Sequence, residues 1–472
     1  QKHYMKPKIM FINPNFQGKI KAISQITVGP PLGLAYLASI LENNNFNVKI
    51  LDANVHGLNT KQILDNVLKF NPKIIGISAV TPTIYSVHDL AIAIKKILPN
   101  VKIILGGVHS STLPKDTLNR FKAFDVIVLN EGESIIFELC SSLIQNKQID
   151  KIQGIAFRKK DKIIINKHSK FISNLDSIPF PARHLLPMDK YRSVVSENFT
   201  TMIAMRGCYA KCNYCSVPFF SGNVIRRRTP KNIINEMIEC YTSYGTKHFS
   251  FLDDTFTTNK KWVHEFCNEI TTSVLYKKIT WMCLTRVDNI DEKLLRDMKK
   301  TGCIKIEFGI ETGSQEILDF SKKGVTKNQI RNAFHLAKKV DLPTLGFLIL
   351  NMPLETKKSI SESKNFILEL DPDFLQISFA TPYPGTNLEQ YARDNDLKMD
   401  KDWSKYLFLN EVVMENKNIS KKEIIRLKNN IEKSFYLRPA YFFRLLKFMI
   451  KYKTYKSIFR SSLNALKELF KI

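Results

Sequence analysis

The 472-residue sequence predicts an α/β protein with two successive parallel sheets and a helical end. Three observations support this. Short apolar segments rich in β-branched residues alternate with helical segments over residues 8–145, the alternation resumes over residues 200–386, and residues 387–472 are helical, polar and basic. Buried strands separated by helices are typical of parallel sheets. We therefore expect an N-terminal doubly wound parallel sheet, a partial (β/α)6 barrel and a helical C-terminal region.

The first predicted domain, residues 5–145, contains five short strands with helices between them, for example at 32–42 and 87–98. We expect the strands at residues 8–13, 48–53, 74–80, 103–107 and 126–130. In doubly wound sheets, ligands bind beyond the carboxyl ends of the strands. Polar or glycine residues lie at or just after these ends: Asp52, Asn54, Ser78, Thr81, Gly106, Gly107, Glu131 and Gly132.

Residues 146–199 are expected to connect the two sheets, with a small hairpin at 154–157 and 162–166 and an irregular proline-rich stretch at 175–183. The barrel is expected over residues 200–386. Its strands are predicted at 201–205, 248–252, 280–284, 305–309, 344–350 and 374–379. Thr229 and Pro230 are a good N-cap and first residue for its first helix.

Three cysteines, Cys208, Cys212 and Cys215, follow the first barrel strand with the spacing Cys-x3-Cys-x2-Cys. Three thiolates on one loop can hold three irons of a 4Fe–4S cluster and leave the fourth iron open to a small molecule. A zinc site is the alternative. Zinc usually takes four ligands in closely spaced pairs, and although Cys240 and His248 are available, no second such pair follows.

This spacing, with Tyr214 directly before the last cysteine, resembles the signature of radical S-adenosylmethionine (SAM) enzymes. The resemblance implies that Cys208, Cys212 and Cys215 are catalytic as cluster ligands. It also implies that the open iron chelates the amino and carboxylate groups of SAM. An electron from the cluster would then cleave SAM into methionine and a 5′-deoxyadenosyl radical.

Together, the first sheet and the cysteine loop resemble the cobalamin-binding subgroup of radical SAM enzymes, over about residues 8–440. This subgroup includes cobalamin-dependent methyltransferases and anaerobic magnesium-protoporphyrin monomethyl ester cyclases. The segments that carry the resemblance are 30–34, 52–57, 106–109, 130–133, 175–183 and 186–191. It implies a flavodoxin-like cobalamin-binding domain with contacts from Asp52, Asn54, Gly57, Ser78, Thr81, Gly106, Gly107, Glu131 and Gly132. A flavodoxin-like domain that binds nothing is the alternative.

Asn54 stands where many cobalamin proteins have the cobalt-ligating histidine of Asp-x-His-x-x-Gly. An amide is a poor cobalt ligand, so we expect cobalamin to bind without a protein imidazole on its lower face. His56 lies two positions further on and is expected to point elsewhere.

The resemblance also implies SAM contacts at the ends of the barrel strands. Asp253 and Asp254 would meet the amino group, Arg286 the carboxylate and Glu311 the ribose, with structural ion pairs or caps as the alternative. Asn351 and Leu354 replace two glycines that usually follow the fifth strand, so this loop on the adenine side of the site is more constrained. The full set of expected SAM contacts is Tyr214, Asp253, Asp254, Arg286, Glu311 and Gly346. Tyr383, after the sixth strand, would face the substrate or form a turn.

The formal net charge of +27 reflects either lysine spread over every surface or an anionic partner. For the three arginines at 226–228 we expect a solvated face or an anion contact, and we expect no nucleic-acid binding, because no stacking aromatic residues are interleaved with them. From Lys433 to Ile472 there are ten Lys or Arg residues and one acidic residue, Glu468. This basic amphipathic segment either lies on an anionic membrane or packs its apolar face on the barrel.

The cysteines outside the loop are scattered, which favours a reducing cytosol over a disulfide framework. The first domain contains only Cys140, whereas methylthiotransferases carry three further cysteines there, so that class is not expected. No apolar stretch reaches the roughly 20 residues that span a bilayer. We expect a cytoplasmic protein, with the C-terminal region as its contact if it meets the inner membrane face.

The sequence therefore predicts a cobalamin-dependent radical SAM methyltransferase that methylates an unactivated carbon. Two alternatives remain open: a cyclase or rearrangement enzyme with the same cofactors, and a non-catalytic cobalamin or iron–sulfur binding protein at a membrane surface. The expected partners are a small-molecule or lipid-like substrate and a reduced electron donor of the flavodoxin or ferredoxin type.

Overall fold

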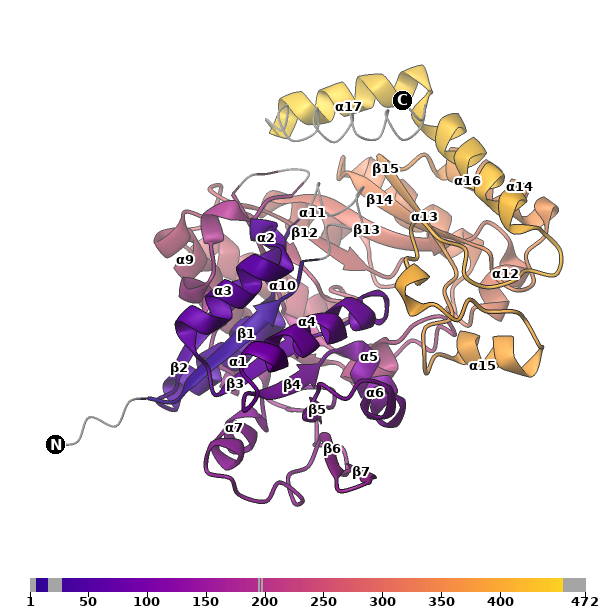
Figure 1. The fold of residues 1–472 in the computed structure, drawn as a ribbon. Coiled ribbons are helices and arrows are strands. Elements are labelled where there is room, and N and C mark those ends of the chain that lie inside the picture. Colours follow the sequence, from indigo (N-terminus) through magenta and orange to yellow (C-terminus); the bar gives the residue numbers. More distant parts are fainter. Residues whose placement is uncertain (1–5, 16–27, 194–195, 197, 453–472) are drawn as a thin grey trace.

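The computed structural model describes residues 6–15, 28–193, 196 and 198–452, which form two parallel sheets with their helices and a C-terminal helical region (Figure 1). The first sheet has the order β2-β1-β3-β4-β5-β6-β7. Strands β1 to β5 are parallel, in the flavodoxin-like order. The strands are β1 (Lys8–Asn13), β2 (Asn47–Asp52), β3 (Ile74–Ser78), β4 (Lys102–Gly106), β5 (Val126–Val128), β6 (Ile155–Lys159) and β7 (Lys162–Ile165).

Helices cover both faces of this sheet, as a doubly wound fold requires. Side chains alternate along β1, so that Ile9 and Phe11 pack with α1 and α7 while Met10 and Ile12 pack with α3 and α4. The helices of this domain are α1 (Leu32–Asn43), α2 (Ala53–His56), α3 (Thr60–Phe70), α4 (Ile84–Ile97), α5 (Val108–Thr112), α6 (Pro114–Arg120) and α7 (Ile136–Ile144).

The hairpin that we assigned to the connector extends the first sheet instead. Strand β6 pairs antiparallel with β5, with Val126 opposite Phe157, and β7 pairs with β6. Burial of Ile155 and Phe157 accounts for this, because these side chains join the core on the α1 side of the sheet. The hairpin thus covers the edge that β5 would otherwise expose.

The second sheet has six parallel strands in the order β15-β14-β13-β12-β11-β8. Each strand pairs with the next one in sequence, which gives the expected partial barrel. Its strands are β8 (Phe199–Met202), β11 (His248–Phe251), β12 (Thr280–Thr285), β13 (Cys303–Glu311), β14 (Thr344–Leu350) and β15 (Phe374–Phe379). A two-stranded ribbon, β9 (Met205–Arg206) with β10 (Arg226–Arg227), lies beyond β8.

Helices pack on the outer face of the barrel. Thr229 caps α9 by accepting a hydrogen bond from the backbone N–H of Asn232, and Pro230 is the first helical residue, as predicted. The helices are α8 (Val217–Ser221), α9 (Pro230–Tyr244), α10 (Lys260–Thr272), α11 (Glu292–Lys300), α12 (Gln315–Phe320), α13 (Lys327–Lys339) and α14 (Lys357–Leu370).

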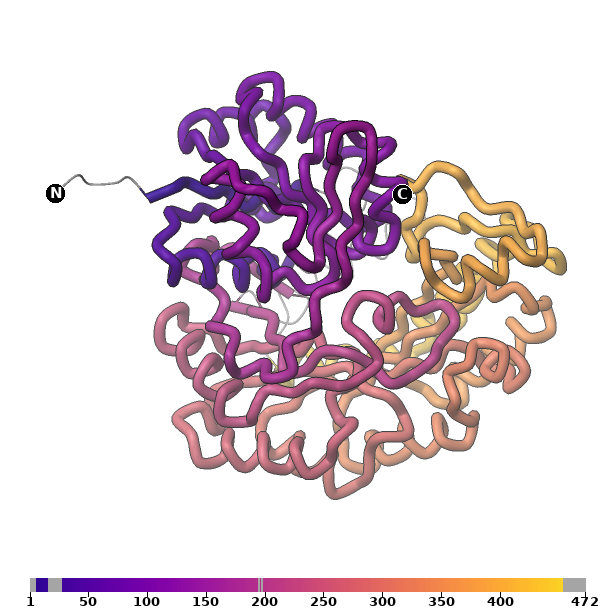
Figure 2. The backbone as a smooth tube through the Cα atoms, turned by 90° about the horizontal axis from the view of Figure 1, so that it is seen from below, coloured from indigo at the N-terminus to yellow at the C-terminus, as the bar shows by residue number. Residues whose placement is uncertain are grey.

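The C-terminal region contacts both domains (Figure 2). It contains α15 (Asn387–Asp394), η5 (Trp403–Lys405), α16 (Lys421–Tyr436) and α17 (Pro439–Tyr452). Trp403 stacks on Tyr85 of α4 with ring centroids 6.0 Å apart, and the guanidinium of Arg120 lies over the Trp403 ring. This indole therefore joins the C-terminal region to the first domain.

One face of α17 closes the amino end of the barrel. Phe448 is buried among Phe199, Met282 and Ile304, near the starts of β8, β12 and β13. Of the two arrangements left open by the sequence, packing on the barrel accounts for this face. Basic residues of α17 also pair with barrel carboxylates: Arg444 with Asp371 and Lys451 with Asp341.

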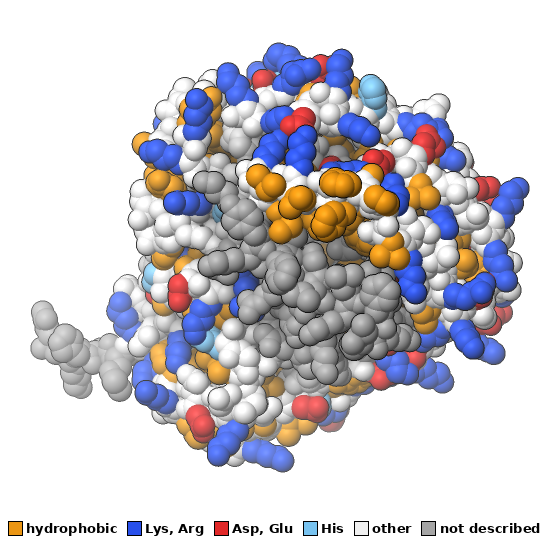
Figure 3. Space-filling view, turned by 90° about the horizontal axis from the view of Figure 1, so that it is seen from above, with side chains coloured by type: hydrophobic (Ala, Val, Ile, Leu, Met, Phe, Trp, Pro, Cys, Tyr) orange, Lys and Arg blue, Asp and Glu red, His pale blue; other side chains and the backbone are white. Residues whose placement is uncertain are grey.

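The opposite face of α17 exposes large apolar side chains, and Figure 3 shows hydrophobic side chains gathered on this side of the molecule. The exposed residues are Phe442, Phe443, Leu446 and Ile450, which we call the α17 stripe. The remainder of the basic segment, 453–472, lies outside the described residues. In the part of the chain that the structure describes, no helix has the length and apolarity to cross a membrane.

Buried ion pairs between charged side chains hold the connector against the barrel. Arg183, in η3 (Arg183–Leu185), and Arg228 both pair with Glu236 of α9, with N–O distances of 2.6 and 2.5 Å. Arg226 is also buried, against Glu131. Two of the three arginines at 226–228 are therefore inside the protein, and the expectation of a solvated face is wrong for them. The single-turn helices η1 (Thr81–Thr83), η2 (Leu175–Ser177) and η4 (Met188–Lys190) complete the fold.

Candidate functional site

The carboxyl ends of the two parallel sheets meet at the contact between the domains. Glu131, just after β5, forms an ion pair with Arg226 of β10 at 2.7 Å. Thr112, at the end of α5, lies against Gly385 in the loop after β15, where an added Cβ would be 3.0 Å from Thr112 Cγ2. Ligands bound at these ends would therefore face each other across the contact.

The cysteine loop, residues 207–216, joins β9 to α8 at the carboxyl end of the barrel. Gly207 has φ +91°, and an added Cβ would lie 2.4 Å from the backbone oxygen of Val224, so the position requires glycine. The backbone N–H of Cys208 donates to the carbonyl of Gly222 at 3.2 Å. These two features fix the first cysteine at the barrel mouth.

Asn213 fixes the second half of the loop. Its backbone N–H donates to the carbonyl of Ser321 at 2.9 Å, and its Nδ2 donates to the carbonyl of Phe320 at 2.8 Å. The backbone N–H of Leu388 donates to the Asn213 carbonyl at 2.8 Å. Sequence reasoning missed this residue, because its side-chain partner lies 107 positions away and nothing local marks the contact.

All eight cysteines carry free thiols. Burial raises the pKa of the Cys208, Cys212 and Cys215 thiols, that of Cys215 to about 12. Such thiols become stable thiolates when a metal supplies the positive charge. Within the described residues, no three His, Cys, Asp or Glu side chains lie close enough to surround one ion. A cubane cluster differs because each thiolate binds a separate iron, and the loop suits that arrangement.

Three of the residues predicted to contact SAM lie around these thiols. Burial has the largest effect on the thiol pKa values. Among the charges, Asp254 raises the pKa of Cys208, Lys323 lowers and Glu311 raises that of Cys212, and Arg286 lowers both. Asp254 is open to solvent, yet the surrounding protein raises its own pKa to about 6 by desolvation. It is therefore an available carboxylate at neutral pH.

Arg286 is oriented by its neighbours at the end of β12. Its Nη2 lies 2.8 Å from Asp288 Oδ2, and its guanidinium is 5.5 Å from the centroid of the Tyr209 ring in the cysteine loop. The Tyr209 hydroxyl accepts a hydrogen bond from Asn289 Nδ2 at 2.9 Å. The cysteine loop and the end of β12 thus hold each other in place.

Asp253 follows the carboxyl end of β11, as predicted, but its side chain is turned into the protein. Its Oδ1 accepts hydrogen bonds from the backbone N–H groups of Ala204 and Met205, and the side chain is buried. Burial raises its pKa to about 7, against the lowering effect of these hydrogen bonds. Asp253 therefore braces the chain that leads to the cysteine loop, whereas Asp254 is exposed. A direct contact of Asp253 with SAM stays a prediction.

Glu311 forms a buried ion pair with Lys323 at the mouth. Glu311 has φ +65°, at an irregularity in the pairing of β13 with β14. An added Cβ at Gly309 would lie 2.2 Å from both Glu311 Oε1 and Lys323 Nζ, so glycine makes room for the pair. Lys323 was not predicted as a site residue. Its pairing with Glu311 depends on the chain turning back toward β13 after α12, which the sequence does not reveal. A non-glycine residue at positive φ marks backbone strain, which is often found at ligand sites.

The loop after β14 keeps its backbone shape without glycine. Asn351 adopts φ +71°, the left-handed region that asparagine tolerates best among non-glycine residues, and its Nδ2 donates to the carbonyl of Met414 at 3.0 Å. Glu355 accepts a hydrogen bond from the backbone N–H of Met352, and burial raises its pKa to about 8. Asn351 thus adopts the positive φ that glycine would adopt at this position. Leu354, at the position of the second replaced glycine, is exposed.

Three further predicted contacts have definite places. An added Cβ at Gly346 would lie 2.5 Å from Ile310 Cδ1 and close to Phe334, so this glycine faces the helix layer rather than the barrel interior. Tyr383 donates its hydroxyl to the carbonyl of Tyr406 at 2.9 Å, and burial raises its pKa to about 12. Tyr214 lies beside Cys212, and burial raises the pKa of Tyr214 well above its usual value.

Asp52 is saturated by protein donors. Its Oδ1 accepts from Asn13 Nδ2 at 2.8 Å and from the backbone N–H groups of Asn54 and Val55, so it caps α2. Its Oδ2 accepts from the Tyr191 hydroxyl at 2.7 Å. Asp52 thus shapes the loop after β2 and ties the connector to it.

The other residues of that loop follow from this cap. Asn54 lies half-buried in the single turn of α2. Gly57 ends the turn in the left-handed conformation, with φ 62°. His56 is exposed, and its Nδ1 lies 3.1 Å from Lys190 Nζ. The expectation that His56 points away from a cobalamin face remains a prediction.

The ends of β3 and β4 form the part of this domain that suits a large planar ligand. An added Cβ at Gly106 would meet nothing within 4 Å, so there is open space above β4. Ser78 is half-buried, and Val80 is an exposed apolar side chain in the loop after β3. At Gly107 φ is +103°, and an added Cβ would lie 2.3 Å from the Ala79 carbonyl oxygen. These open and apolar positions are compatible with an apolar macrocycle that carries polar side groups. If side chains filled the space beyond the strand ends, such a ligand would be excluded.

The remaining predicted cobalamin contacts are turned into the protein. Thr81 is buried, with its Oγ1 3.3 Å from Nδ1 of His109, whose ring packs edge-on against Trp403. Gly132 lies near Leu37, which is 3.2 Å from an added Cβ. Glu131 is also buried, and both its carboxylate oxygens are bound by Arg226. For these residues a direct contact stays a prediction.

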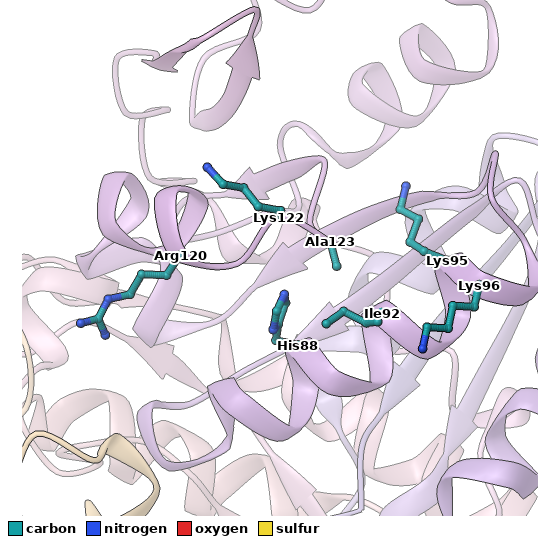
Figure 4. A pocket seen from close by; sticks show the side chains of 7 residues that line it. All are labelled: His88, Ile92, Lys95, Lys96, Arg120, Lys122 and Ala123. Atoms are coloured by element: carbon teal, nitrogen blue, oxygen red, sulfur yellow. The ribbon is translucent and has the colours of Figure 1, made fainter.

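One shallow hollow lies elsewhere, on the outer surface of the first domain (Figure 4). It is lined by His88, Ile92, Lys95, Lys96, Arg120, Lys122 and Ala123. Lys95 pairs with Asp125, which precedes β5, so the hollow reaches the amino ends of the strands. No ligand chemistry is assigned to it.

Comparisons with known proteins match both halves of the chain. Residues 22–139 match the B12 binding domain family, and residues 202–367 match the radical SAM superfamily. An uncharacterized methyltransferase of Pyrococcus horikoshii is 36% identical over 432 residues, which cover 92% of this chain and 93% of that protein. The anaerobic magnesium-protoporphyrin IX monomethyl ester cyclase of Cereibacter sphaeroides is 27% identical, covering 92% of this chain and 71% of the cyclase.

The fold is similar to that of a solved protein, the radical S-adenosylmethionine methyltransferase TsrM from Kitasatospora setae. The TM-score is 0.68 with 16% sequence identity, and the match covers 82% of this chain and 76% of TsrM. That structure has cobalamin and a 4Fe–4S cluster bound. At this identity the likeness concerns the fold.

We expect replacement of Cys212 by alanine to prevent assembly of the cluster. One of three thiolates would be lost, and Cys208 and Cys215 alone cannot hold a cubane cluster firmly. The measurement is iron and sulfide per chain, with the visible absorbance, after anaerobic reconstitution. Cys267→Ala is the matched control, because that thiol lies in the barrel core. Equal iron and sulfide in the Cys212 variant and the wild type would contradict the assignment.

Proposed function

Because the chain belongs to the B12-binding radical SAM enzymes, we propose that it is a cobalamin-dependent methyltransferase that methylates an unactivated carbon. One observation carries the proposal: the carboxyl ends of the two parallel sheets face each other, and each presents a site suited to one cofactor. A substrate held between them would meet both.

The cofactors supply the reactive chemistry when bound: SAM and the cluster provide a carbon-centred radical that removes hydrogen, and cobalamin relays the methyl group from a second SAM. The protein then has to bind the cofactors and the substrate, orient them and exclude water from the site. Cys208, Cys212 and Cys215 would hold the cluster on a loop that Gly207 and Asn213 fix at the mouth.

The charged residues around the loop suit the groups of SAM. The Asp254 carboxylate is open to solvent and matches the amino group, and the Arg286 guanidinium matches the carboxylate. Glu311, held by Lys323, would accept hydrogen bonds from ribose hydroxyls. Each of these roles uses a different strand end, as is usual at the carboxyl mouth of a barrel.

On the facing sheet, cobalamin would lie over Gly106 and Val80, with Ser78 and Gly107 beside it. The half-buried Asn54 offers an amide where a histidine would ligate cobalt. We therefore propose that cobalamin binds without an imidazole from this loop on its lower face. Without that imidazole, bound cobalamin would be easier to reduce and to methylate.

The relatives support methyl transfer and also define the alternative. The Pyrococcus horikoshii relative is named a methyltransferase and matches nearly the full length of both chains. The Cereibacter sphaeroides relative is a cyclase, so ring closure with the same cofactors is the second candidate function. The reaction also needs a small-molecule substrate and an electron donor. We propose that the donor is a reduced flavodoxin or ferredoxin.

Methyl-labelled SAM distinguishes these functions. With anaerobically reconstituted protein, cobalamin and a chemical reductant, we expect labelled methylcobalamin, S-adenosylhomocysteine and 5′-deoxyadenosine to form together. Their amounts are measured by mass spectrometry, with the Cys212→Ala variant as a control that should lose deoxyadenosine. Formation of deoxyadenosine alone would contradict methyl transfer and favour a cyclase or rearrangement enzyme. If none of the three forms in protein that holds both the cluster and cobalamin, the result would contradict an enzyme and favour a binding protein.

We also propose that the α17 stripe meets anionic lipid. Its apolar side chains are exposed on a basic helix, and the exposed Lys447 lies among them in sequence. Replacing Phe442 and Phe443 by serine should lower the fraction of protein that floats with phosphatidylglycerol vesicles and leave the fold intact, because both side chains are exposed. Val224→Ser, at an exposed valine outside the stripe, is the control. A wild-type protein that stays unbound to these vesicles would rule out the contact.

A further inference from the structure

Four charged side chains are buried together between the first domain and the barrel. Glu131 and Glu133 follow β5, Arg206 ends β9, and Arg226 begins β10. Their side chains are 7%, 7%, 12% and 8% exposed, in that order, so water screens the group poorly. Two carboxylates balance two guanidinium groups. We call this set the interdomain clamp.

The geometry of the clamp is directional. Glu131 binds Arg226 through both oxygens, with Nη1–Oε2 and Nη2–Oε1 distances of 2.8 and 2.7 Å. Arg206 bridges the two acids, at 3.3 Å from Glu131 and 2.6 Å from Glu133. Bidentate pairs of this kind fix the angle between partners as well as the distance. Burial would raise the pKa of Glu131, but the two guanidinium groups lower it below the usual range, so the carboxylate stays charged.

The arginines of the clamp lie at the base of the cysteine loop. Arg206 is separated from Cys208 only by Gly207. The positive φ and close backbone contact of Gly207 constrain the path of the chain between them. Arg206 and Arg226 are direct partners in the β9–β10 ribbon, which flanks the loop on both sides in sequence. The first domain also holds the other end of the loop: Asn130 Nδ2 donates to the carbonyls of Phe219 and Phe220 in α8 at 2.8 and 3.1 Å.

We infer that Glu131 and Glu133 are positioning residues, which set the orientation of the cysteine loop relative to the first domain through Arg206 and Arg226. The sequence suggested instead that Glu131 contacts cobalamin. Its two oxygens are occupied by guanidinium groups of the other domain, and this favours the positioning role. The two cofactor sites are then aligned by a contact that touches neither cofactor.

This inference rests on the proposed function for the identity of the cluster, but its main readout does not need turnover. The reduced cluster of Glu131→Gln should give an altered EPR spectrum before SAM is added, because the loop carrying its thiolates has shifted. Cobalamin affinity should match the wild type, and deoxyadenosine formation should fall by about a hundredfold, the scale expected for a displacement of about 1 Å at a reacting centre. Glu138→Gln, at an exposed glutamate of α7, is the matched control.

A double-mutant cycle separates positioning from general destabilisation. Glu131→Gln and Arg226→Gln should each change the cluster spectrum, and the double variant should be no worse than the single variants, because both remove the same contact. If Glu131→Gln does not fold, Glu133→Gln provides the test through Arg206. Additive effects, an unchanged spectrum, or lost cobalamin binding with a normal cluster would overturn the inference. An inactive wild type with a normal cluster spectrum would instead count against the proposed function alone.

Discussion

The apposition of two carboxyl edges is the constraint on which the rest of the structure depends. Parallel strands bring all their C-terminal loops to one edge of a sheet, so each sheet can offer only one mouth. Here the two mouths face each other, with Glu131 and Thr112 on one side and Arg226 and Gly385 on the other. The connector, the hairpin β6–β7 and the C-terminal region pack around this arrangement rather than within it.

Buried charges hold the apposition in place. Glu236 joins Arg183 of the connector to Arg228 of the barrel, and the interdomain clamp joins the first sheet to the base of the cysteine loop. Burying ions carries a desolvation penalty, so such groups are better at fixing one geometry than at adding stability. A site that must align two large cofactors benefits from that specificity.

The local residue pattern predicted the positions of the strands well. It did not predict which distant residues pair with a strand or a side chain. The bounds of β1, β14 and β15 match the predicted strands, because runs of β-branched residues are a local signal. The hairpin was misplaced because its pairing with β5 depends on the open edge of a sheet formed by distant residues. The position of Asp253 after a strand does not reveal the hydrogen bonds that its Oδ1 accepts from Ala204 and Met205. Asn213 and Lys323 were missed for the same reason, whereas the cysteine loop was found because its signal is entirely local.

The central claim is that one chain holds a cluster and cobalamin face to face, each at the carboxyl end of its own sheet. EPR spectroscopy tests it directly, on protein loaded with cob(II)alamin and with the cluster reduced in the same sample. The account predicts a magnetic interaction between the two centres, seen as broadening or splitting of the cobalt signal that disappears when the cluster is oxidised. Two superimposed spectra, each identical to that of a singly loaded sample, would contradict it.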